Sequence, residues 1–162
     1  MPIDICLHMQ INAAVMDKEP PKPRSSGCTC MRLRKASRRV SQIYDRSLEP
    51  LGLTVTQFGL LGNLDRLDGI SIGELAGRLV MDPTTLTRNL RPLERQGLVV
   101  FAPDPNDRRS RCLHLTAAGR KAYSGAKPAW ARAQRHVDKA LGDVDAPALN
   151  RMLDRVLECL AV

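Results

Sequence analysis

The sequence predicts a mainly α-helical fold that carries one small β-hairpin. Three observations support this class: apolar residues recur at three- and four-residue steps through most of the chain, helix-capping residues stand before these runs, and one short segment changes to a two-residue period. That segment, residues 98–115, directly follows two short helical patterns. The order of helix, helix and hairpin is typical of a winged helix-turn-helix.

The first short helix is predicted to begin at Ser71. Ser71 and Glu74 have the S-x-x-E spacing of a capping box, in which each side chain accepts a hydrogen bond from the other residue's backbone N–H. Behind this cap the apolar residues keep helical spacing and are expected on one buried stripe: Ile72, Leu75, Ala76, Leu79 and Val80. The pattern therefore predicts a short amphipathic helix.

The second short helix is predicted to begin at Asp82 and Pro83. Aspartate is a favoured N-cap, and proline loses nothing at the first helical position because the N–H there has no partner. Leucines at i, i+4 and i+7 are expected to face the core: Leu86, Leu90 and Leu93. Pro92 removes a helical hydrogen bond and predicts a kink or an early end.

The other face of this second helix is polar and basic. Its candidate DNA-contacting residues are Thr84, Thr85, Thr87, Arg88 and Arg91. The second helix of a helix-turn-helix enters the major groove by its N-terminal end, where an arginine can hold guanine with two hydrogen bonds. Arg88 is therefore the leading candidate for reading a base.

The two-residue period begins after Gly97, which predicts a helix stop. Residues 98–102 are short and β-prone. Residues 111–115 alternate, so Leu113 and Leu115 are expected to point inward and Cys112 and His114 outward. This pattern predicts the two strands of a hairpin.

The loop between the predicted strands, residues 103–110, is rich in Pro, Asn and Asp and carries paired arginines. A narrow minor groove concentrates negative potential, and an inserted arginine exploits it. We therefore expect Arg108 and Arg109 to contact DNA. Asp107 is expected to orient Arg109 through a charge-assisted hydrogen bond.

As an ordered set, these landmarks resemble the MarR (multiple antibiotic resistance regulator) family over residues 31–162. The resemblance implies a homodimeric bacterial repressor or activator whose binding to DNA changes with a small ligand or with thiol oxidation. The landmarks are Thr54 with Gln57 and Phe58, Ser71 with Glu74, Leu75 and Ala76, Thr87 and Arg88, Leu93 and Glu94 with Gly97, Leu98 and Val99, Asp107 to Arg109, and Leu115 and Thr116 with Gly119 and Arg120.

Composition fits this interpretation. A length of 162 residues suits one domain, and a hydrophobic content of 43% is enough to build a core. The net charge of +8 and the isoelectric point near 9.7 favour a polyanionic partner, which nucleic acid or an anionic membrane surface would both supply. Aromatic residues make up only 3% of the chain, which argues against a protein that stacks single-stranded bases on its side chains. Duplex DNA is therefore favoured.

Two other classes are excluded. No apolar run is long enough to span a bilayer, and the N-terminus lacks the form of a signal peptide, so we expect a cytoplasmic protein without a membrane partner. The sequence contains no G-x-S-x-G, no glycine-rich phosphate loop and no H-E-x-x-H, so we expect no enzyme and no cofactor. The remaining alternative to a DNA-binding regulator is a winged-helix module for protein assembly. Arginines on both the second helix and the loop favour DNA.

The predicted organisation is an N-terminal tail, residues 1–27, and a single domain, residues 28–162. Within that domain, residues 53–116 form the winged-helix lobe, and residues 28–50 and 117–162 form dimerisation helices. The first helix of the lobe is expected to be capped by Thr54 through Gln57. The first dimerisation helix has an expected inner face of Met31, Ala36, Val40, Ile43 and Tyr44. It also carries a basic run that fits either phosphate contact or a solvated face: Arg32, Arg34, Lys35, Arg38 and Arg39.

The C-terminal third supplies the argument for a dimer. Thr116 is expected to cap a long helix, residues 117–141, with Pro128 as a possible bend. The last helix has an apolar stripe that must be buried, either on a second copy or on its own chain: Leu149, Met152, Leu153, Val156, Leu157 and Leu160. A two-fold dimer predicts a pseudo-palindromic DNA site.

Two sets of residues are candidates for sensing a signal. Of the five cysteines, Cys28 and Cys30 stand beside arginines, which favour the thiolate, and fit a sensor of oxidant or soft metal that Cys159 of the partner subunit would complete. The alternative is that these are ordinary thiols, and the C-x-C pair lacks the second pair of a structural zinc site, so no metal site is expected. Tyr44 and Phe58 would wall a cleft for a small effector, or else belong to a plain core.

Overall fold

The computed structural model describes residues 27–103, 111–142 and 145–161. The predicted tail and the loop residues Asp107, Arg108 and Arg109 therefore lie outside the described residues. The chain divides into two units, Met1–Ala36 and Ser37–Val162, and the boundary falls within the first helix.

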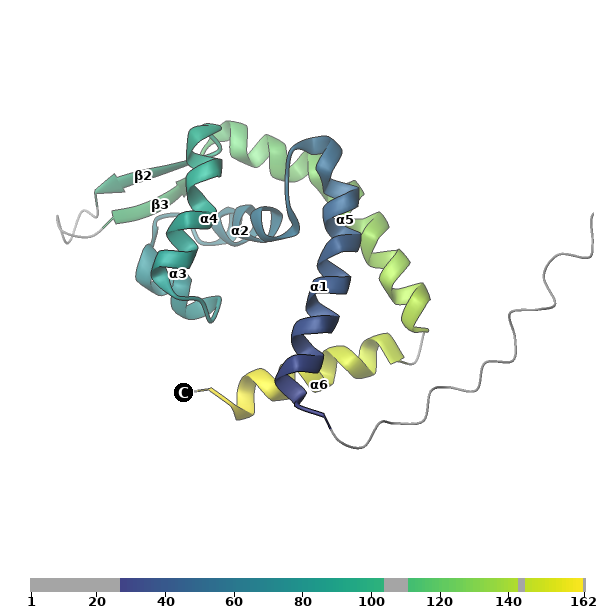
Figure 1. The fold of residues 1–162 in the computed structure, drawn as a ribbon. Helices are drawn as coiled ribbons and strands as arrows, with labels where there is room; N and C mark the ends of the chain where they lie inside the picture. The colour runs from purple at the N-terminus through teal and green to yellow at the C-terminus, as the bar shows by residue number, and fades with distance from the viewer. Residues whose placement is uncertain (1–26, 104–110, 143–144, 162) are drawn as a thin grey trace, which may run out of the picture. The chain divides into compact units, whose positions relative to one another are not determined.

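The described residues are mainly helical and include one small antiparallel sheet (Figure 1). Both short helices, both hairpin strands and the long helix of the predicted winged helix-turn-helix are present, which confirms the expected fold class. In chain order the elements are α1 (Thr29–Leu48), the 3-10 turn η1 (Glu49–Leu51), α2 (Val55–Arg66), β1 (Ile70–Ser71), α3 (Ile72–Arg78), α4 (Pro83–Arg95), β2 (Val99–Pro103), β3 (Arg111–Leu115), α5 (Ala117–Leu141) and α6 (Asp145–Cys159).

Side-chain caps set the beginnings of four helices, as the sequence predicts. In α2 and α3 a full capping box forms, because the N-cap hydroxyl accepts from the third backbone N–H and the third side chain accepts from the N-cap N–H. In α4 and α5 the N-cap side chain accepts from backbone N–H groups of the first turn. The four N-cap residues are Thr54, Ser71, Asp82 and Thr116.

The core of the winged-helix lobe is built mainly from leucines that lie between α2, α3, α4 and the sheet. The largest fully buried side chains of this lobe are Leu60, Leu61, Leu64, Leu75, Leu86, Leu90, Leu93 and Leu113. Their burial confirms the inward face predicted for α4. Each leucine contributes about 1.5–3 kcal/mol when it leaves water, so this set holds the DNA-reading elements in fixed positions.

Two glycines allow α5 to approach the rest of the lobe closely. A Cβ on Gly119 would lie 2.0 Å from the Leu98 carbonyl oxygen, and a Cβ on Gly62 would lie 2.9 Å from the Tyr123 hydroxyl oxygen. Neither position can accept a larger residue without movement of its neighbours. The beginning of α5 is therefore pressed against both α2 and the residue before β2.

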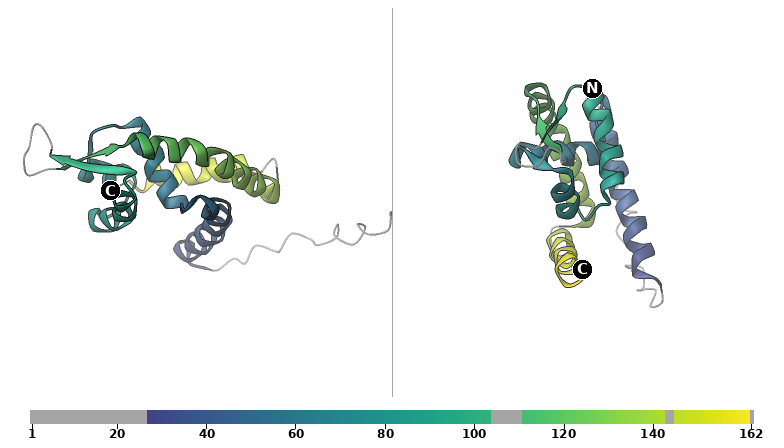
Figure 2. Two further views of the ribbon diagram at one scale, coloured as in Figure 1. Left: turned by 90° about the horizontal axis from the view of Figure 1, so that it is seen from above. Right: turned by 90° about the vertical axis from the view of Figure 1, so that its left-hand side faces the viewer.

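The sheet has the strand order β1-β3-β2, and the β2–β3 hairpin projects beyond the helices that pack on it (Figure 2). The strand β1 was not predicted because two residues are too few to show a period. It makes β3 the central strand, with Ser71 and Ala102 on either side of Cys112. The expectation that Cys112 points outward is wrong, because its side chain is buried. Leu113 and Leu115 are buried as predicted.

The end of α3 also differs from the prediction. The helix ends at Arg78, and Val80, expected on the buried stripe, is 80% exposed. Val80 has φ +50° and is the only residue other than glycine with positive φ in the part of the chain that the structure describes. Such a conformation costs a β-branched residue about 1–3 kcal/mol.

Neither internal proline ends its helix. Although Pro92 lacks the N–H that would bond to the Arg88 carbonyl, α4 continues through it to Arg95, so the expected early end is wrong. The leucine face on both sides of the proline holds the helix in place. Similarly, α5 runs from Ala117 to Leu141 through Pro128 as one helix (Figure 2).

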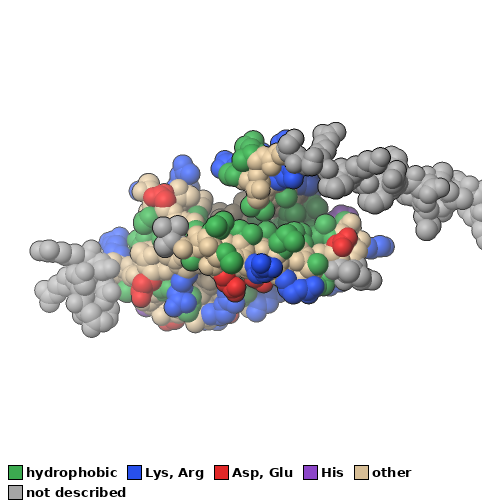
Figure 3. Space-filling model, turned by 90° about the horizontal axis from the view of Figure 1, so that it is seen from below, with side chains coloured by type: hydrophobic (Ala, Val, Ile, Leu, Met, Phe, Trp, Pro, Cys, Tyr) green, Lys and Arg blue, Asp and Glu red, His purple; other side chains and the backbone are tan. Residues whose placement is uncertain are grey.

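The predicted inner faces of α1 and α6 are only partly covered by this chain. Along α1, Tyr44 is buried and Val40 and Ile43 are half-buried, whereas Met31 and Ala36 are exposed. Along α6, only Ala146 is buried. Figure 3 shows hydrophobic side chains gathered along this helix, of which the exposed ones are Leu149, Met152, Leu157 and Leu160.

Candidate nucleic-acid interface

An open hollow of about 440 Å³ lies on the outer face of α4. It is lined by Pro83, Thr84, Thr87, Arg88 and Arg91. Four of the five candidate residues predicted on this helix therefore come together at one surface. The hollow lies opposite the buried leucines, so the packing that fixes α4 also directs these side chains to solvent.

The cap at the start of α4 determines what its threonines can do. The Asp82 carboxylate accepts hydrogen bonds from the backbone N–H of Thr84 at 3.2 Å and of Thr85 at 2.8 Å. Hydrogen bonds from the Thr85 side chain and these N–H groups hold the pKa of Asp82 below its usual value. Thr85 is half-buried and belongs to this cap rather than to the lining of the hollow.

Thr87 is also partly engaged within the helix. Its hydroxyl donates to the Pro83 carbonyl oxygen at 2.8 Å, so the hydroxyl oxygen remains free as an acceptor but not as a donor. Thr84 is exposed at the end of the hollow nearest the cap. The two threonines therefore offer different hydrogen-bonding groups to a ligand.

The charge at this surface is positive. Arg88 and Arg91 are exposed, and within residues 27–103, 111–142 and 145–161 neither guanidinium has an acidic partner. Arg95 is exposed on the same face, four residues beyond Arg91. Sequence reasoning missed Arg95, although its spacing from Arg88 and Arg91 was the signal that would have found it.

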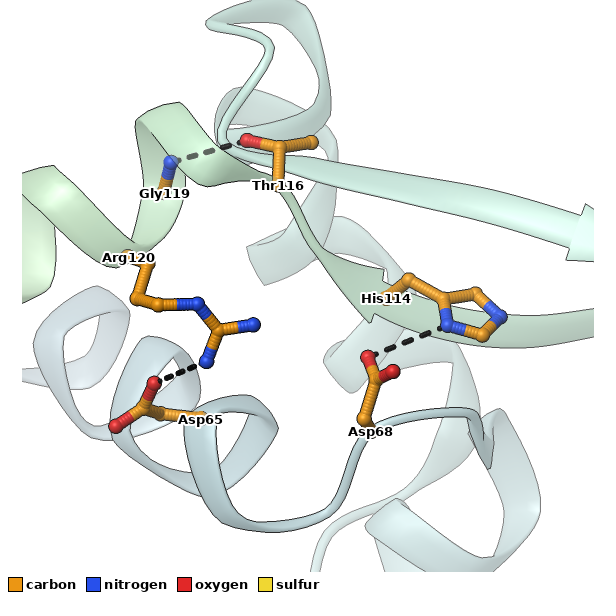
Figure 4. A network of polar contacts seen from close by, with 6 residues as sticks. All are labelled: Asp65, Asp68, His114, Thr116, Gly119 and Arg120. Carbon is orange, nitrogen blue, oxygen red and sulfur yellow. Dashed lines mark hydrogen bonds and ion pairs between the residues drawn. The ribbon is translucent and has the colours of Figure 1, made fainter.

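Polar contacts fasten the hairpin to the helices (Figure 4). Asp68, in the loop after α2, lies 3.2 Å from Nδ1 of His114 on β3, and Asp65, near the end of α2, pairs with Arg120 at 2.7 Å. The Thr116 hydroxyl accepts from the Gly119 N–H at 3.0 Å. The end of α2 thus holds both the inner strand of the hairpin and the first turn of α5. The contacts of Asp68 with His114 and of Asp65 with Arg120 join residues far apart in sequence, and no local pattern indicated them, whereas the Thr116 cap was predicted.

The hairpin loop leaves β2 at Pro103 and returns at Arg111, which are paired across the strands. Arg111 is exposed at this junction and was not among the predicted contacts. The predicted loop residues Asp107, Arg108 and Arg109 lie between these two and outside the described residues.

The known proteins to which this chain is similar include transcriptional regulators. The family model for the MarR family matches residues 51–110. The transcriptional activatory protein BadR of Rhodopseudomonas palustris is 32% identical over 133 residues, which cover 80% of this chain and 74% of BadR. This chain belongs to the MarR family. Its function is that of a winged helix-turn-helix transcriptional regulator.

Two solved structures extend the likeness of this MarR-family regulator to complexes with DNA. The Mycobacterium tuberculosis regulator MosR in complex with DNA is 38% identical, with a TM-score of 0.74 over 82% of this chain and 96% of MosR. The transcriptional repressor CouR bound to a 23-mer DNA duplex is 31% identical, with a TM-score of 0.74 over 86% of this chain and 99% of CouR.

The two effector candidates of this MarR-family regulator lie in one aromatic cluster between α1, α2 and α5. The Trp130 ring lies 6.2 Å from Tyr44 and is stacked 5.8 Å from Phe58, which lies 5.0 Å from Tyr123. The Tyr44 hydroxyl donates to Oε1 of Gln134. Burial, together with the nearby Asp138 carboxylate, raises the pKa of Tyr44. Tyr44 is thus a neutral hydrogen-bonding group inside an apolar cluster.

The cysteine candidates are free and exposed. Cys28 directly precedes α1 and Cys30 lies in its first turn, whereas Cys159 ends α6 in the other unit. Among the described residues no three His, Cys, Asp or Glu side chains are grouped to hold a metal ion. No helix in the described ranges is both long and apolar enough to cross a bilayer.

Proposed function

We propose that this MarR-family regulator binds a pseudo-palindromic duplex site as a homodimer and reads base edges with the N-terminal half of α4. The observation that carries the proposal is the hollow on α4, where two guanidinium groups that have no acidic partner among the described residues stand beside two threonines with different hydrogen-bonding groups. We assign to Arg88, which lines this hollow with Thr84 and Arg91, the role of holding guanine O6 and N7. Arg91 supplies a second cation for a phosphate or base edge.

Arg108 and Arg109 are proposed to contact the minor groove beside the major groove that α4 enters, and Asp107 is proposed to orient Arg109. The fastening of β3 to the end of α2 supports this role, because it fixes the strand that leads out of the loop. A module used only for protein assembly would gain little from a row of unpaired cations on α4. The structures of MosR and CouR in complex with DNA also support DNA binding by this chain.

The homodimer part of the proposal rests on α6. Its exposed apolar side chains are covered by nothing in the described part of the chain, and they share one helix with the half-buried Leu153 and Val156. A second copy would bury them and set two α4 helices about 34 Å apart, one helical turn of DNA. The site would then have two-fold symmetry.

The test is selection of bound sequences from random duplex DNA, with the parent and with Arg88→Ala. We expect a two-fold symmetric motif for the parent. Arg88→Ala should relax the preference at one base pair of each half-site and weaken binding by about 1–3 kcal/mol per contact. Arg135→Ala, which removes an exposed charge from α5, is the matched control and should leave the motif unchanged. An unaltered motif with Arg88→Ala would reject the base-reading role.

We further propose that the protein acts in the cytoplasm as a non-catalytic repressor and is released from DNA by a signal. One candidate signal is oxidation of Cys28 and Cys30 to a disulfide, in which an oxidant accepts two electrons and two protons from the thiols. The other is a small effector bound among Tyr44, Phe58 and Trp130, and it would have to bind the two protein conformations with different affinity.

The thiol route is tested with diamide. Diamide should release the parent from DNA and leave the double variant Cys28→Ser, Cys30→Ser bound, because serine cannot form the disulfide. Cys159→Ser, measured in parallel, reports whether the partner subunit's Cys159 takes part. If diamide releases the double variant as readily as the parent, the pair is not the sensor, and the aromatic cluster becomes the site to test.

A further inference from the structure

Val80 occupies a position that the backbone reserves for glycine. The Met81 N–H donates to the Ala76 carbonyl oxygen at 2.9 Å, and the Val80 N–H donates to the Gly77 carbonyl oxygen at 3.1 Å. This pair of bonds is the Schellman motif that ends α3, and it places Val80 at the residue that must be left-handed. Glycine adopts that conformation without steric penalty, whereas a β-branched side chain does not.

The side chain of Val80 gains little from the rest of the protein. It is 80% exposed, more than any other large hydrophobic side chain in the described residues. Its neighbours Leu79 and Met81 are both half-buried, so the chain turns Val80 outward between two residues that do pack. Neither backbone conformation nor burial within the described chain favours valine at this position.

The position of Val80 in the chain suggests why a valine is present there. Val80 lies two residues before Asp82, the N-cap of α4, and three residues before Pro83, which lines the hollow on the DNA-reading face. Under the proposed function, this end of α4 enters the major groove. The apolar group that base edges present in that groove is the 5-methyl of thymine.

We infer that Val80 contacts a thymine methyl group of the DNA site and is a specificity-determining residue. The inference rests on the proposed function, because it requires α4 to enter the major groove by its N-terminal end. It also explains why a strained and solvent-exposed valine occupies the turn. The contact would exclude water from both methyl-bearing groups when DNA binds.

The test combines Val80→Gly with DNA in which deoxyuridine replaces single thymines of the selected site. Deoxyuridine keeps the base pair and lacks the methyl group. Parent protein should lose about fourfold in affinity at one thymine of each half-site, the value for one buried methyl group. Val80→Gly should bind the thymine site about fourfold more weakly than the parent and show no further loss on the deoxyuridine site.

The thermal stability of the free variant separates this role from a folding defect. Val80→Gly relieves the left-handed strain, so its Tm without DNA should rise although its affinity for DNA falls. Leu141→Ala, which trims an exposed leucine at the end of α5, is the control and should change neither the affinity nor the response to deoxyuridine.

Each other outcome overturns the inference. If Val80→Gly binds DNA as tightly as the parent, Val80 makes no contact. If the variant binds more weakly but the parent does not distinguish thymine from deoxyuridine at any position, the contact is not to the methyl group. A lower Tm for Val80→Gly would remove the premise of strain. Failure of the parent to select any duplex is a different result, which rejects the proposed function itself.

Discussion

The winged-helix lobe and the terminal helix α6 bury their apolar residues in different ways. In the lobe, Leu86, Leu90 and Leu93 are fully buried by elements of the same chain. In α6, an equally regular apolar stripe leaves Met152 and Leu157 more than half exposed. The same periodicity therefore produces a closed core in one region and an open face in the other. The amphipathic pattern shows which residues are to be buried, but it does not show whether the cover comes from the same chain.

The largest expected effect is a loss of folding stability when a cavity is made in the core of the winged-helix lobe. Leu90→Ala removes buried methyl groups between α4 and the sheet, so the free energy of unfolding should fall by about 2–5 kcal/mol. Urea unfolding of the monomer measures this change. Met152→Ala on α6, where the side chain is 66% exposed, is the comparison and should lose far less. Equal losses of unfolding free energy in the two variants would contradict the difference in burial between the winged-helix lobe and α6.

A second effect is expected in self-association. Met152→Asp and Leu157→Asp place charges on the open face of α6, and each should raise the dimer dissociation constant at least about tenfold, because a buried side chain contributes about 1.5–3 kcal/mol. Sedimentation equilibrium measures the constant, and circular dichroism checks that the chain stays folded. Glu158→Ala, a change at an exposed polar position of the same helix, should leave it unchanged. A dimer that tolerates both aspartates would have its interface elsewhere.

The smallest expected effect concerns the pH dependence of thermal stability, to which Asp82 in the winged-helix lobe contributes. The pKa of Asp82 is held low in the folded protein, so its capping contribution is complete above the unfolded-state value, about 3.9, and is lost as the pH falls through the lower folded value. Asparagine caps a helix without titrating. Asp82→Asn should therefore flatten the decline of Tm below about pH 4. An unchanged pH profile would show that other carboxylates cause the decline.

The parts of the fold that could be predicted are those set by residues close in sequence. The caps at Thr54, Ser71, Asp82 and Thr116 hydrogen-bond to residues two or three positions away, so their spacing alone indicated them. The leucine face of α4 follows from helical spacing. Because that face was correct, the polar face of the same helix was correct too, and four predicted residues line one hollow.

Most of the parts that could not be predicted depend on distant residues. Cys112 is buried on the central strand of the sheet, and nothing near residue 112 indicates the two-residue strand β1 that makes β3 central. Val80 fits a helical stripe until the Schellman bonds end the helix two residues earlier. The contact of Asp68 with His114 joins residues 46 positions apart. For Cys112 and for the Asp68–His114 contact the distant neighbour determines the outcome, whereas the end of α3 is set by local backbone hydrogen bonds that apolar spacing does not reveal.

The unbroken α5 has a mechanical consequence. Its 25 residues make about 37 Å of helix along the axis, since each residue of an α-helix advances the axis by about 1.5 Å. Thr116 alone joins this helix to β3, and Gly119 packs closely against Leu98 at that end. A tilt of about 10° about Gly119 would carry the opposite end through about 6 Å, by the same rise per residue. A small rotation at the hairpin end of α5 would therefore appear as a larger displacement at the far end of the helix.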